Sequence, residues 1–324
     1  MMLRAIVVAF ASLLGSATGG LAQTYPARQI TMVVPFAAGG ATDIIGRALA
    51  ERMRVSLGQP VIVENVGGAN GNIGVGRVAA AAPDGYTIGI GHWSTHVVNG
   101  AVYSLPYDLL ADLTPISPIS DSPQVIVSNI AVPANDLREL IAWLKANANK
   151  ATLSTPGAGS PHHIAGILLQ KLTQTQFRFV PYRGGAPALQ DVLAGHIDLT
   201  MPIAIAALPY IRAGKLRAYA VTGSKRLDAA PDIPTVDEAG VPGLHISVWH
   251  GLWAPKGTPE DIVAKLDAAV VDALANATVR SRFADLGQDI FPRQQQTPEA
   301  LATLQRAEIA KWWPIIKAAN IRLE

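Results

Sequence analysis

The chain has 324 residues, of which 49% are apolar, with 26 basic and 24 acidic side chains and no cysteine. This length suggests about two domains, and the near-neutral charge excludes a broad basic surface for nucleic acid. The absence of cysteine excludes disulfides, thiolate metal sites and a cysteine nucleophile.

The N-terminal segment has the pattern of a secretory signal peptide. Arg4 precedes the mostly apolar run Ala5–Leu14, and small residues follow at Gly20 and Ala22. An apolar run this short does not span a membrane as a helix. We therefore predict cleavage after Ala22, a mature chain that begins at Gln23, and a periplasmic location. An uncleaved membrane anchor is the alternative.

Short apolar runs alternate with amphipathic helical patterns along the rest of the chain. The predicted strands are Ile30–Val34, Val61–Glu64, Tyr86–Ile90, Val125–Ser128, Ala151–Ser154, Phe177–Val180, Ile197–Met201, Arg217–Val221 and His245–Trp249. The predicted helices are Asp43–Leu57, Asn72–Ala81, Asp136–Ala148, Pro161–Thr173, Pro187–Ala194, Ile203–Ala213, Pro259–Ala275, Val279–Leu286 and Pro298–Ala318. This alternation is typical of parallel sheets that helices cover on both faces.

The length of the mature chain favours two α/β lobes, because about 300 residues exceed what a single core usually supports. The predicted crossings between the lobes are Ser120–Val132 and Val248–Pro255, which are rich in proline or glycine near strand ends.

Loops rich in glycine or hydroxyl groups follow four of the predicted strands. They are PFAAGGATD after Val34, GHWSTH after Ile90, TPGAGSPHH after Ser154 and PYRGGAP after Val180. Ligands of open α/β sheets bind beyond the carboxyl ends of strands, where the free N–H groups of helix N-termini favour an anion. Each loop alone reads as an ordinary capped turn, but four together favour an anion-binding cleft.

The sequence contains no motif for catalysis or for a bound metal. A phosphate-binding G-x-x-x-x-G-K-[ST], an acyl-transfer G-x-S-x-G and a zinc-binding H-E-x-x-H are absent, and the seven histidines show no metal spacing. Asp43 would repel an anion placed directly beside it. We therefore expect Asp43 to anchor the N–H groups of its loop, or to meet a ligand hydroxyl, an amine or water. We expect no catalytic residue, no cofactor and no metal.

Several of these segments together resemble the Bug-type receptors, which are the substrate-binding proteins of tripartite tricarboxylate transporters. They include VPFAAGGATDIIGRALA, LSTPGAGSPHHIAG, VPYRGGAPALQDVLAGHIDL and APKGTP, in the order and spacing of that family. The resemblance covers essentially the whole mature chain. It implies an α/β, two-lobed periplasmic-binding-protein fold of type II, in which each lobe is a mainly parallel sheet flanked by helices. The implied division is a signal peptide at 1–22, lobe one at 23–125 and 251–324, and lobe two at 126–250.

The resemblance also implies a ligand, a site and partners. The family binds small carboxylates between its lobes, so the expected partners are a small carboxylate and membrane transporter subunits, with no nucleic acid and a monomeric receptor. The implied ligand-binding residues are Phe36, Ala37, Ala38, Gly39, Gly40, Thr42, Asp43, Trp93, Ser94, Thr95, Ser154, Thr155, Gly159, Ser160, His162, Tyr182, Gly184 and Ala186. We expect neutral donors such as Thr155 and Ser160, rather than Arg183, to hold the carboxylate.

The chain departs from the pattern of this family at a few positions. Pro202 stands near the position where many relatives have an aspartate, and His250 lies within a W-H-G sequence. His92 and Trp93 are also residues that differ from the usual pattern of the family. These departures favour a more acidic or more aromatic ligand than those of relatives. Two other functions stay open, namely an exported enzyme that uses the same cleft and a sensor that docks on a membrane signalling protein.

Overall fold

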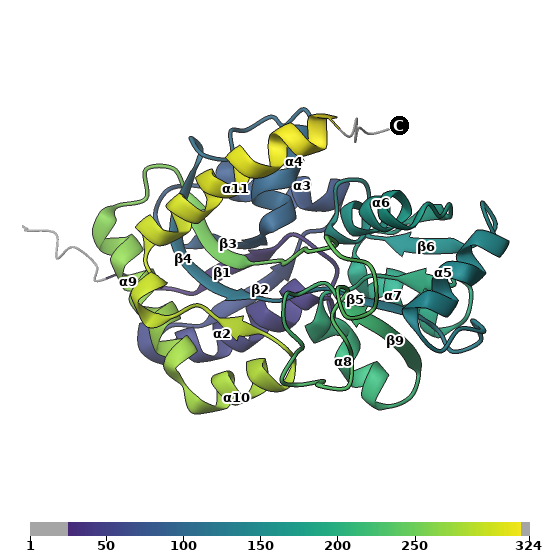
Figure 1. Ribbon diagram of the computed structural model, residues 1–324. Coiled ribbons are helices and arrows are strands. Elements are labelled where there is room, and N and C mark those ends of the chain that lie inside the picture. The colour runs from purple at the N-terminus through teal and green to yellow at the C-terminus, as the bar shows by residue number, and fades with distance from the viewer. Residues whose placement is uncertain (1–24, 319–324) are drawn as a thin grey trace, which may run out of the picture.

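The computed structural model describes residues 25–318, which form two lobes that lie side by side (Figure 1). The predicted signal peptide and its cleavage site lie outside these residues. The strands are β1 Ile30–Val34, β2 Val61–Asn65, β3 Thr87–His92, β4 Leu113–Asp121, β5 Val125–Asn129, β6 Thr152–Thr155, β7 Arg178–Pro181, β8 Leu199–Thr200, β9 Leu216–Val221, β10 His250–Pro255 and β11 Asp289–Ile290. The α-helices are α2 Ala41–Leu57, α3 Asn72–Ala79, α4 Asn99–Val102, α5 Leu137–Ala146, α6 Pro161–Thr173, α7 Gly185–Leu193, α8 Ala204–Arg212, α9 Glu260–Ala275, α10 Ala277–Asp285 and α11 Pro298–Ala318. Short helical turns are η1 Ala69–Gly71, the π-helical η2 Ser94–Val98, and η3 Arg293–Gln295.

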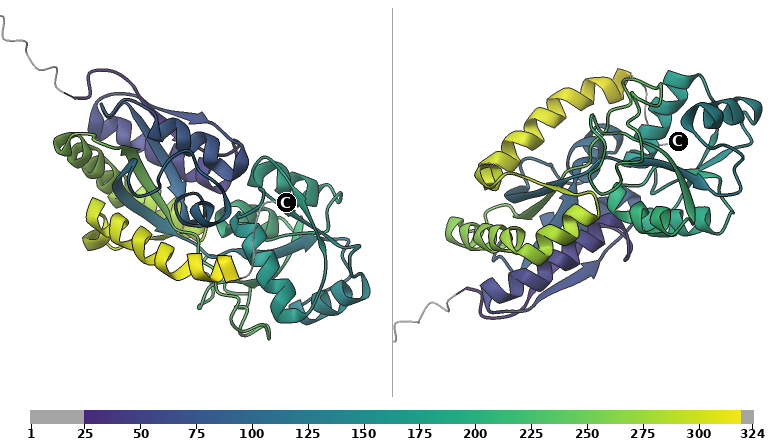
Figure 2. Two further views of the ribbon diagram at one scale, coloured as in Figure 1. Left: turned by 90° about the horizontal axis from the view of Figure 1, so that it is seen from above. Right: turned by 60° about the horizontal axis from the view of Figure 1, so that its bottom comes forward.

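Each lobe is built on one sheet. The first lobe has six strands in the order β11-β4-β10-β3-β1-β2, and the second lobe has five strands in the order β7-β6-β8-β5-β9. Figure 2 shows the two lobes from two further directions, with helix α11 in yellow along the first lobe.

Both sheets are mixed, so the prediction of mainly parallel sheets is wrong in this detail. In the first sheet β1 is parallel to β2 and β3, but β10 is antiparallel to β3 and β4, and β11 is antiparallel to β4. In the second sheet β6 is parallel to β7 and β8, whereas β5 is antiparallel to β8 and β9. The chain passes between the two sheets twice, from β4 to β5 and from β9 to β10. Each antiparallel pair contains at least one of these four strands, because neither passage is a βαβ crossover.

Local patterns located most elements but missed some strands. The predicted strand His245–Trp249 is wrong, since that segment makes only one bridge, at Ser247, and the strand β10 begins at His250. Strand β4 was not predicted because Pro115 and Pro118 interrupt it, and proline donates no ladder hydrogen bond. Shifts of register between β10 and β4 accommodate these prolines inside the sheet.

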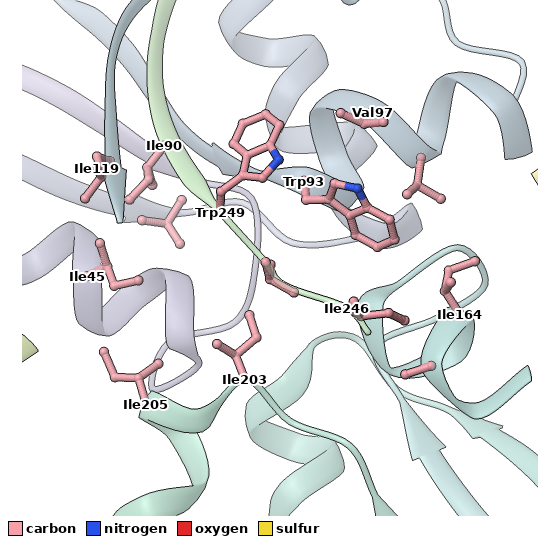
Figure 3. Packing of buried hydrophobic residues seen from close by; sticks show 14 of the residues in the cluster. Ile45, Ile90, Trp93, Val97, Ile119, Ile164, Ile203, Ile205, Ile246 and Trp249 are labelled. Carbon is pink, nitrogen blue, oxygen red and sulfur yellow. The ribbon is translucent and has the colours of Figure 1, made fainter. Parts of the chain in front are cut away.

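One apolar cluster contains residues of both lobes. It contains Trp93 of the first lobe, Ile164 and Ile203 of the second, and Ile246 and Trp249 from the segment that returns to the first lobe (Figure 3). All five side chains are buried. Burying apolar surface between the lobes favours the closed arrangement of this structure. Within residues 25–318, no helix has the length and apolar character needed to cross a membrane.

Candidate functional site

A small cavity lies between the two lobes, with a volume of about 40 Å³. From the first lobe it is lined by Phe36, Gly40, Ala41, Thr42, Asn70 and His92. From the second lobe it is lined by Pro156, Pro161, His162, Gly185, Pro202, Ile203 and Ala206. A cavity of this size holds a few water molecules.

Four helices from both lobes begin at this cavity. Its walls include Gly40 at the start of α2, Pro161 in α6, Gly185 in α7 and Ile203 at the start of α8. Helices α2, α7 and α8 have no side-chain cap at their N-termini. The first turns of helices carry unpaired N–H groups and the positive end of the helix dipole. No lysine, arginine, aspartate or glutamate is among the residues that line the cavity in the described part of the chain. The site is therefore electropositive through backbone dipoles rather than through charged side chains.

The loop that leads from β1 into α2 is held by Asp43. This side chain is 3% exposed and accepts hydrogen bonds from Gly39 N at 2.8 Å, Arg47 Nε at 2.9 Å and Asn65 Nδ2 at 2.9 Å. Burial opposes ionisation of Asp43, but the hydrogen bonds from Arg47, Gly39 and Asn65 outweigh it and lower the pKa of the carboxyl group. Asp43 thus anchors the loop, which was one of the roles expected for it, and it is not among the residues that line the cavity.

His92 presents a neutral donor at the cavity. Its Nδ1 accepts a hydrogen bond from Ser94 N at 3.1 Å, so the proton of the neutral ring is on Nε2. Its ring stacks on Phe36 with 4.9 Å between the ring centroids. Burial lowers the pKa of His92 to about 3. The ring therefore stays neutral near pH 7, and its Nε2–H group is free to donate.

Two further buried histidines lie near His92. Burial lowers the pKa of His162 to about 3, and burial together with His92 lowers that of His250 well below its usual value. His250 Nε2 lies 3.2 Å from Thr42 Oγ1, and its ring packs edge-on against His92. His162 Nδ1 is buried without a hydrogen-bond partner. The site thus contains neutral polar groups that can turn toward a ligand.

The lobes touch each other along the rim of the cavity. Ser94 Oγ donates to Gly159 O at 3.1 Å, and Tyr103 Oη donates to Ala158 O at 2.7 Å. A Cβ placed on Gly184 would lie 3.3 Å from Ala37, which leaves no free space between these two loops. The two lobes are therefore in direct contact in this structure.

A family model for the tripartite tricarboxylate transporter family receptor matches residues 45–321. The chain belongs to this receptor family. The Bordetella pertussis protein BugT is 36% identical to the receptor over 325 residues, which cover 99% of this chain and 98% of BugT. The structure of the periplasmic binding protein BugD is 38% identical, with a TM-score of 0.89, over 92% of this chain and all of that one. The structure of MatC from Rhodopseudomonas palustris with bound malate is 38% identical, with a TM-score of 0.87, over 90% of this chain and all of that one. The resemblance to Bug-type receptors and the two-lobed fold are confirmed.

Four of the predicted ligand-binding residues line the cavity of the receptor, namely Phe36, Gly40, Thr42 and His162. Others lie directly behind it or at the rim. Ser154 Oγ donates to Ala188 O, Thr155 Oγ1 accepts from Gly157 N, Ser160 Oγ caps α6 through His163 N, and Tyr182 Oη donates to Asp191. Ala37, Ala38 and Gly39 form the loop before α2, and Gly184 and Ala186 of the second lobe approach that loop. Thr155 therefore has a structural hydrogen bond, which sequence reasoning did not expect.

Trp93 and Thr95 lie in the core of the receptor rather than at the cavity wall. Trp93 is fully buried and packs edge-on against Trp312, with 4.9 Å between the rings. Thr95 Oγ1 donates to His92 O at 2.9 Å and thereby holds the loop of His92. Of the two, only Thr95 contacts His92 through its side chain.

Several cavity residues of the receptor were not predicted as ligand-binding, above all Asn70, Pro156, Gly185, Ile203 and Ala206. A signal for Asn70 was present, because the glycine-rich sequence VGGANGN also follows a predicted strand. The start of α8 gave no such signal, since its loop TMPI contains neither glycine nor a capping side chain at the helix start.

Proposed function

We propose that this protein is a periplasmic receptor that captures a small organic carboxylate between its lobes and delivers it to the membrane subunits of a tripartite tricarboxylate transporter. The convergence of four helix N-termini on a cavity whose lining within residues 25–318 includes no charged side chain carries the proposal. Fixed N–H groups bind a carboxylate without a lysine or arginine, because they are oriented before the ligand arrives. MatC, which is similar over its whole length, was solved with bound malate.

The division of these donors between two lobes supports a mechanism of closure around the ligand. Micromolar affinity corresponds to about 8 kcal/mol, whereas a charge-assisted hydrogen bond contributes roughly 1.5–3 kcal/mol and association itself costs several kcal/mol. The few donors of a single helix N-terminus fall short, whereas the facing helix N-termini of both lobes together suffice. The ligand therefore stabilises the closed form by binding to it more tightly than to the open form.

We assign the parts of the receptor accordingly. Residues 1–22 are a signal peptide, 23–124 with 250–324 form lobe one, and 125–249 form lobe two. These limits differ by one residue from the expected ones, because β5 begins at Val125 and β10 begins at His250. Phe36, Gly40, Thr42 and His162 contact the ligand, while Asp43, Thr155 and Ser160 hold the loops that carry it. The receptor acts as a monomer that binds its ligand without converting it.

The experiment begins with protein exported from cells by its own leader and purified without refolding. N-terminal sequencing is expected to give Gln23, and native mass spectrometry is expected to show a copurified organic acid. Calorimetry with a panel of mono-, di- and tricarboxylates then gives the affinity, and uptake of the best ligand is compared in wild-type cells and cells that lack the receptor. A receptor that binds no acid of the panel, or uptake that is unchanged without it, contradicts the proposal.

A further inference from the structure

Asn70 occupies a backbone position that favours glycine. It lies in η1 with φ 51° and ψ 37°, between Gly68 at φ 130° and Gly71 at φ 90°. Residues other than glycine are uncommon in this left-handed region, and asparagine is among those that tolerate it best. The chain thus places a polar side chain, only 5% exposed, on a strained turn at the wall of the cavity. Strained backbone of this kind clusters at ligand-binding sites.

The hydrogen-bond network fixes which way the amide of Asn70 is turned. Asn99 Nδ2 donates to Asn70 O at 3.0 Å and to Asn72 Oδ1 at 2.6 Å, so Asn99 Oδ1 must be an acceptor. Asn70 Nδ2 donates to that oxygen at 2.8 Å and to Ser94 Oγ at 2.9 Å. Both N–H groups of the amide are therefore used, and Asn70 Oδ1 is buried with no hydrogen-bond partner among residues 25–318.

An unpaired acceptor at a binding site calls for a donor from the ligand. A carboxylate cannot supply one, because its oxygens only accept hydrogen bonds. An ammonium group could donate, but it would bring a positive charge into a cavity whose described lining contains no carboxylate. A hydroxyl group donates without carrying a charge.

We propose that the ligand is a hydroxycarboxylic acid and that Asn70 Oδ1 accepts the hydrogen bond of its hydroxyl group. The inference rests on the proposed function, since the carboxylate of the same ligand meets the helix N-termini and the Nε2–H group of His92. In this proposal Asn70 is the residue that discriminates between a hydroxy acid and the corresponding acid without the hydroxyl group. A plain acid would leave Oδ1 desolvated and unpaired, which weakens its binding.

The test measures affinities by calorimetry for matched pairs of acids that differ by one hydroxyl group. The pairs are propionate and lactate, succinate and malate, glutarate and 2-hydroxyglutarate, and phenylacetate and mandelate, with both enantiomers of each hydroxy acid. In the pair whose size fits the cleft, one enantiomer of the hydroxy acid is expected to bind at least about tenfold more tightly than the plain acid. In Asn70→Gly, which suits the backbone, the ratio is expected to fall below about twofold.

Ser94→Ala serves as the matched control. It removes one partner of Asn70 Nδ2 and the bond to Gly159 O, but it leaves Asn70 Oδ1 in place. Both acids of a pair are expected to bind more weakly to this variant in the same proportion, so the ratio persists. Melting temperatures verify that both variants fold. If Asn70→Gly does not fold, the ratio of the affinities of the wild-type protein for hydroxy acid and plain acid decides whether the inference holds.

The possible outcomes separate the two proposals. If acids bind but no hydroxy acid is preferred, or if the preference survives in Asn70→Gly, the hydroxy-acid inference is overturned while the carboxylate receptor stands. If no acid of any pair binds, the proposed function fails, and the inference that rests on it fails with it.

Discussion

The carboxylate of Asp43 accepts the backbone N–H of Gly39 at 2.8 Å, across the turn that leads into α2. This bond arranges the loop before any ligand binds, and the salt bridge to Arg47 at 2.9 Å neutralises the charge of Asp43. A carboxylate at the edge of an anion site therefore supports the site instead of opposing it.

Replacing Asp43 with alanine is expected to lower the free energy of unfolding by about 1–3 kcal/mol, because the half-buried bonds from Gly39 N and Asn65 Nδ2 lose their carboxylate acceptor. Urea denaturation measures this loss. Glu51→Gln, an exposed change on the same helix, is the control and is expected to have little effect. Since the pKa of Asp43 is lowered in the folded state, its contribution is complete above its ordinary value of 3.8 and disappears as the pH falls through the folded pKa. If the free energies of unfolding of the wild type and the Asp43→Ala variant differ by the same amount at pH 7 and at pH 2, this role is contradicted.

The buried histidines are expected to make the closed structure sensitive to acid. The unfolded chain takes up protons at His92 and His162 below about pH 6.5, whereas in the closed lobes both stay neutral down to about pH 3. The free energy of unfolding therefore falls as the pH decreases through this window. Each histidine accounts for a slope of up to about 1.4 kcal/mol per pH unit. His92→Gln is expected to reduce the slope. An unchanged slope in His92→Gln would show that this ring does not stay neutral in the closed form.

The hydroxyl group of Tyr103 is expected to help hold the lobes together. It donates to Ala158 O of the opposite lobe at 2.7 Å, whereas the hydroxyl of Tyr107 contacts Asn72 of its own lobe at 3.3 Å. Tyr103→Phe is therefore expected to weaken the best ligand about three- to tenfold, which corresponds to one lost hydrogen bond. Tyr107→Phe is the matched control and leaves closure unaffected. Calorimetry, and small-angle scattering with and without ligand, compare the two variants. Equal effects of the two changes would contradict a role for the Tyr103 hydroxyl in holding the lobes together.

Gly184 is expected to be required for closure. Its φ is 127°, and an added Cβ would lie 3.3 Å from the backbone nitrogen and Cβ of Ala37 in the other lobe. Gly184→Ala is expected to weaken ligand binding at least tenfold while each lobe stays folded. Gly157→Ala, at φ 125° with Asn70 Cβ at 4.0 Å as its nearest neighbour, controls for the strain of such a positive φ. Normal affinity in Gly184→Ala would mean that the ligand-bound form is less closed than this structure.

Arg183 is expected to contribute little to ligand binding, although it is a cation in one of the glycine-rich loops. It is exposed and is not among the residues that line the cavity. Arg183→Gln is therefore expected to change the calorimetric affinity by less than about twofold, in line with a weak exposed charge. Loss of binding in this variant would indicate that a salt bridge to Arg183, rather than the helix N-termini, holds the carboxylate of the ligand.

The sequence by itself determined the local structure and the family. The limits of β1 and α6 were predicted correctly, because short apolar runs and the Ser160–Pro161 cap act over a few neighbouring residues. The glycine-rich loops at the strand ends also follow from local chemistry, and anchoring of its loop was one of the roles expected for Asp43. These features need no knowledge of distant contacts.

Only the tertiary structure decided which loops form one site. The strand β4 pairs with β10, more than a hundred positions further along the chain, in spite of its prolines. That pairing and the return through Ile246 bring the start of α8 and the side chain of Asn70 to the same cavity. The low pKa of His92 and the unpaired Oδ1 of Asn70 likewise arise from burial by residues of both lobes. Burial and partner choice depend on contacts between distant segments, and no local pattern of residues encodes such contacts.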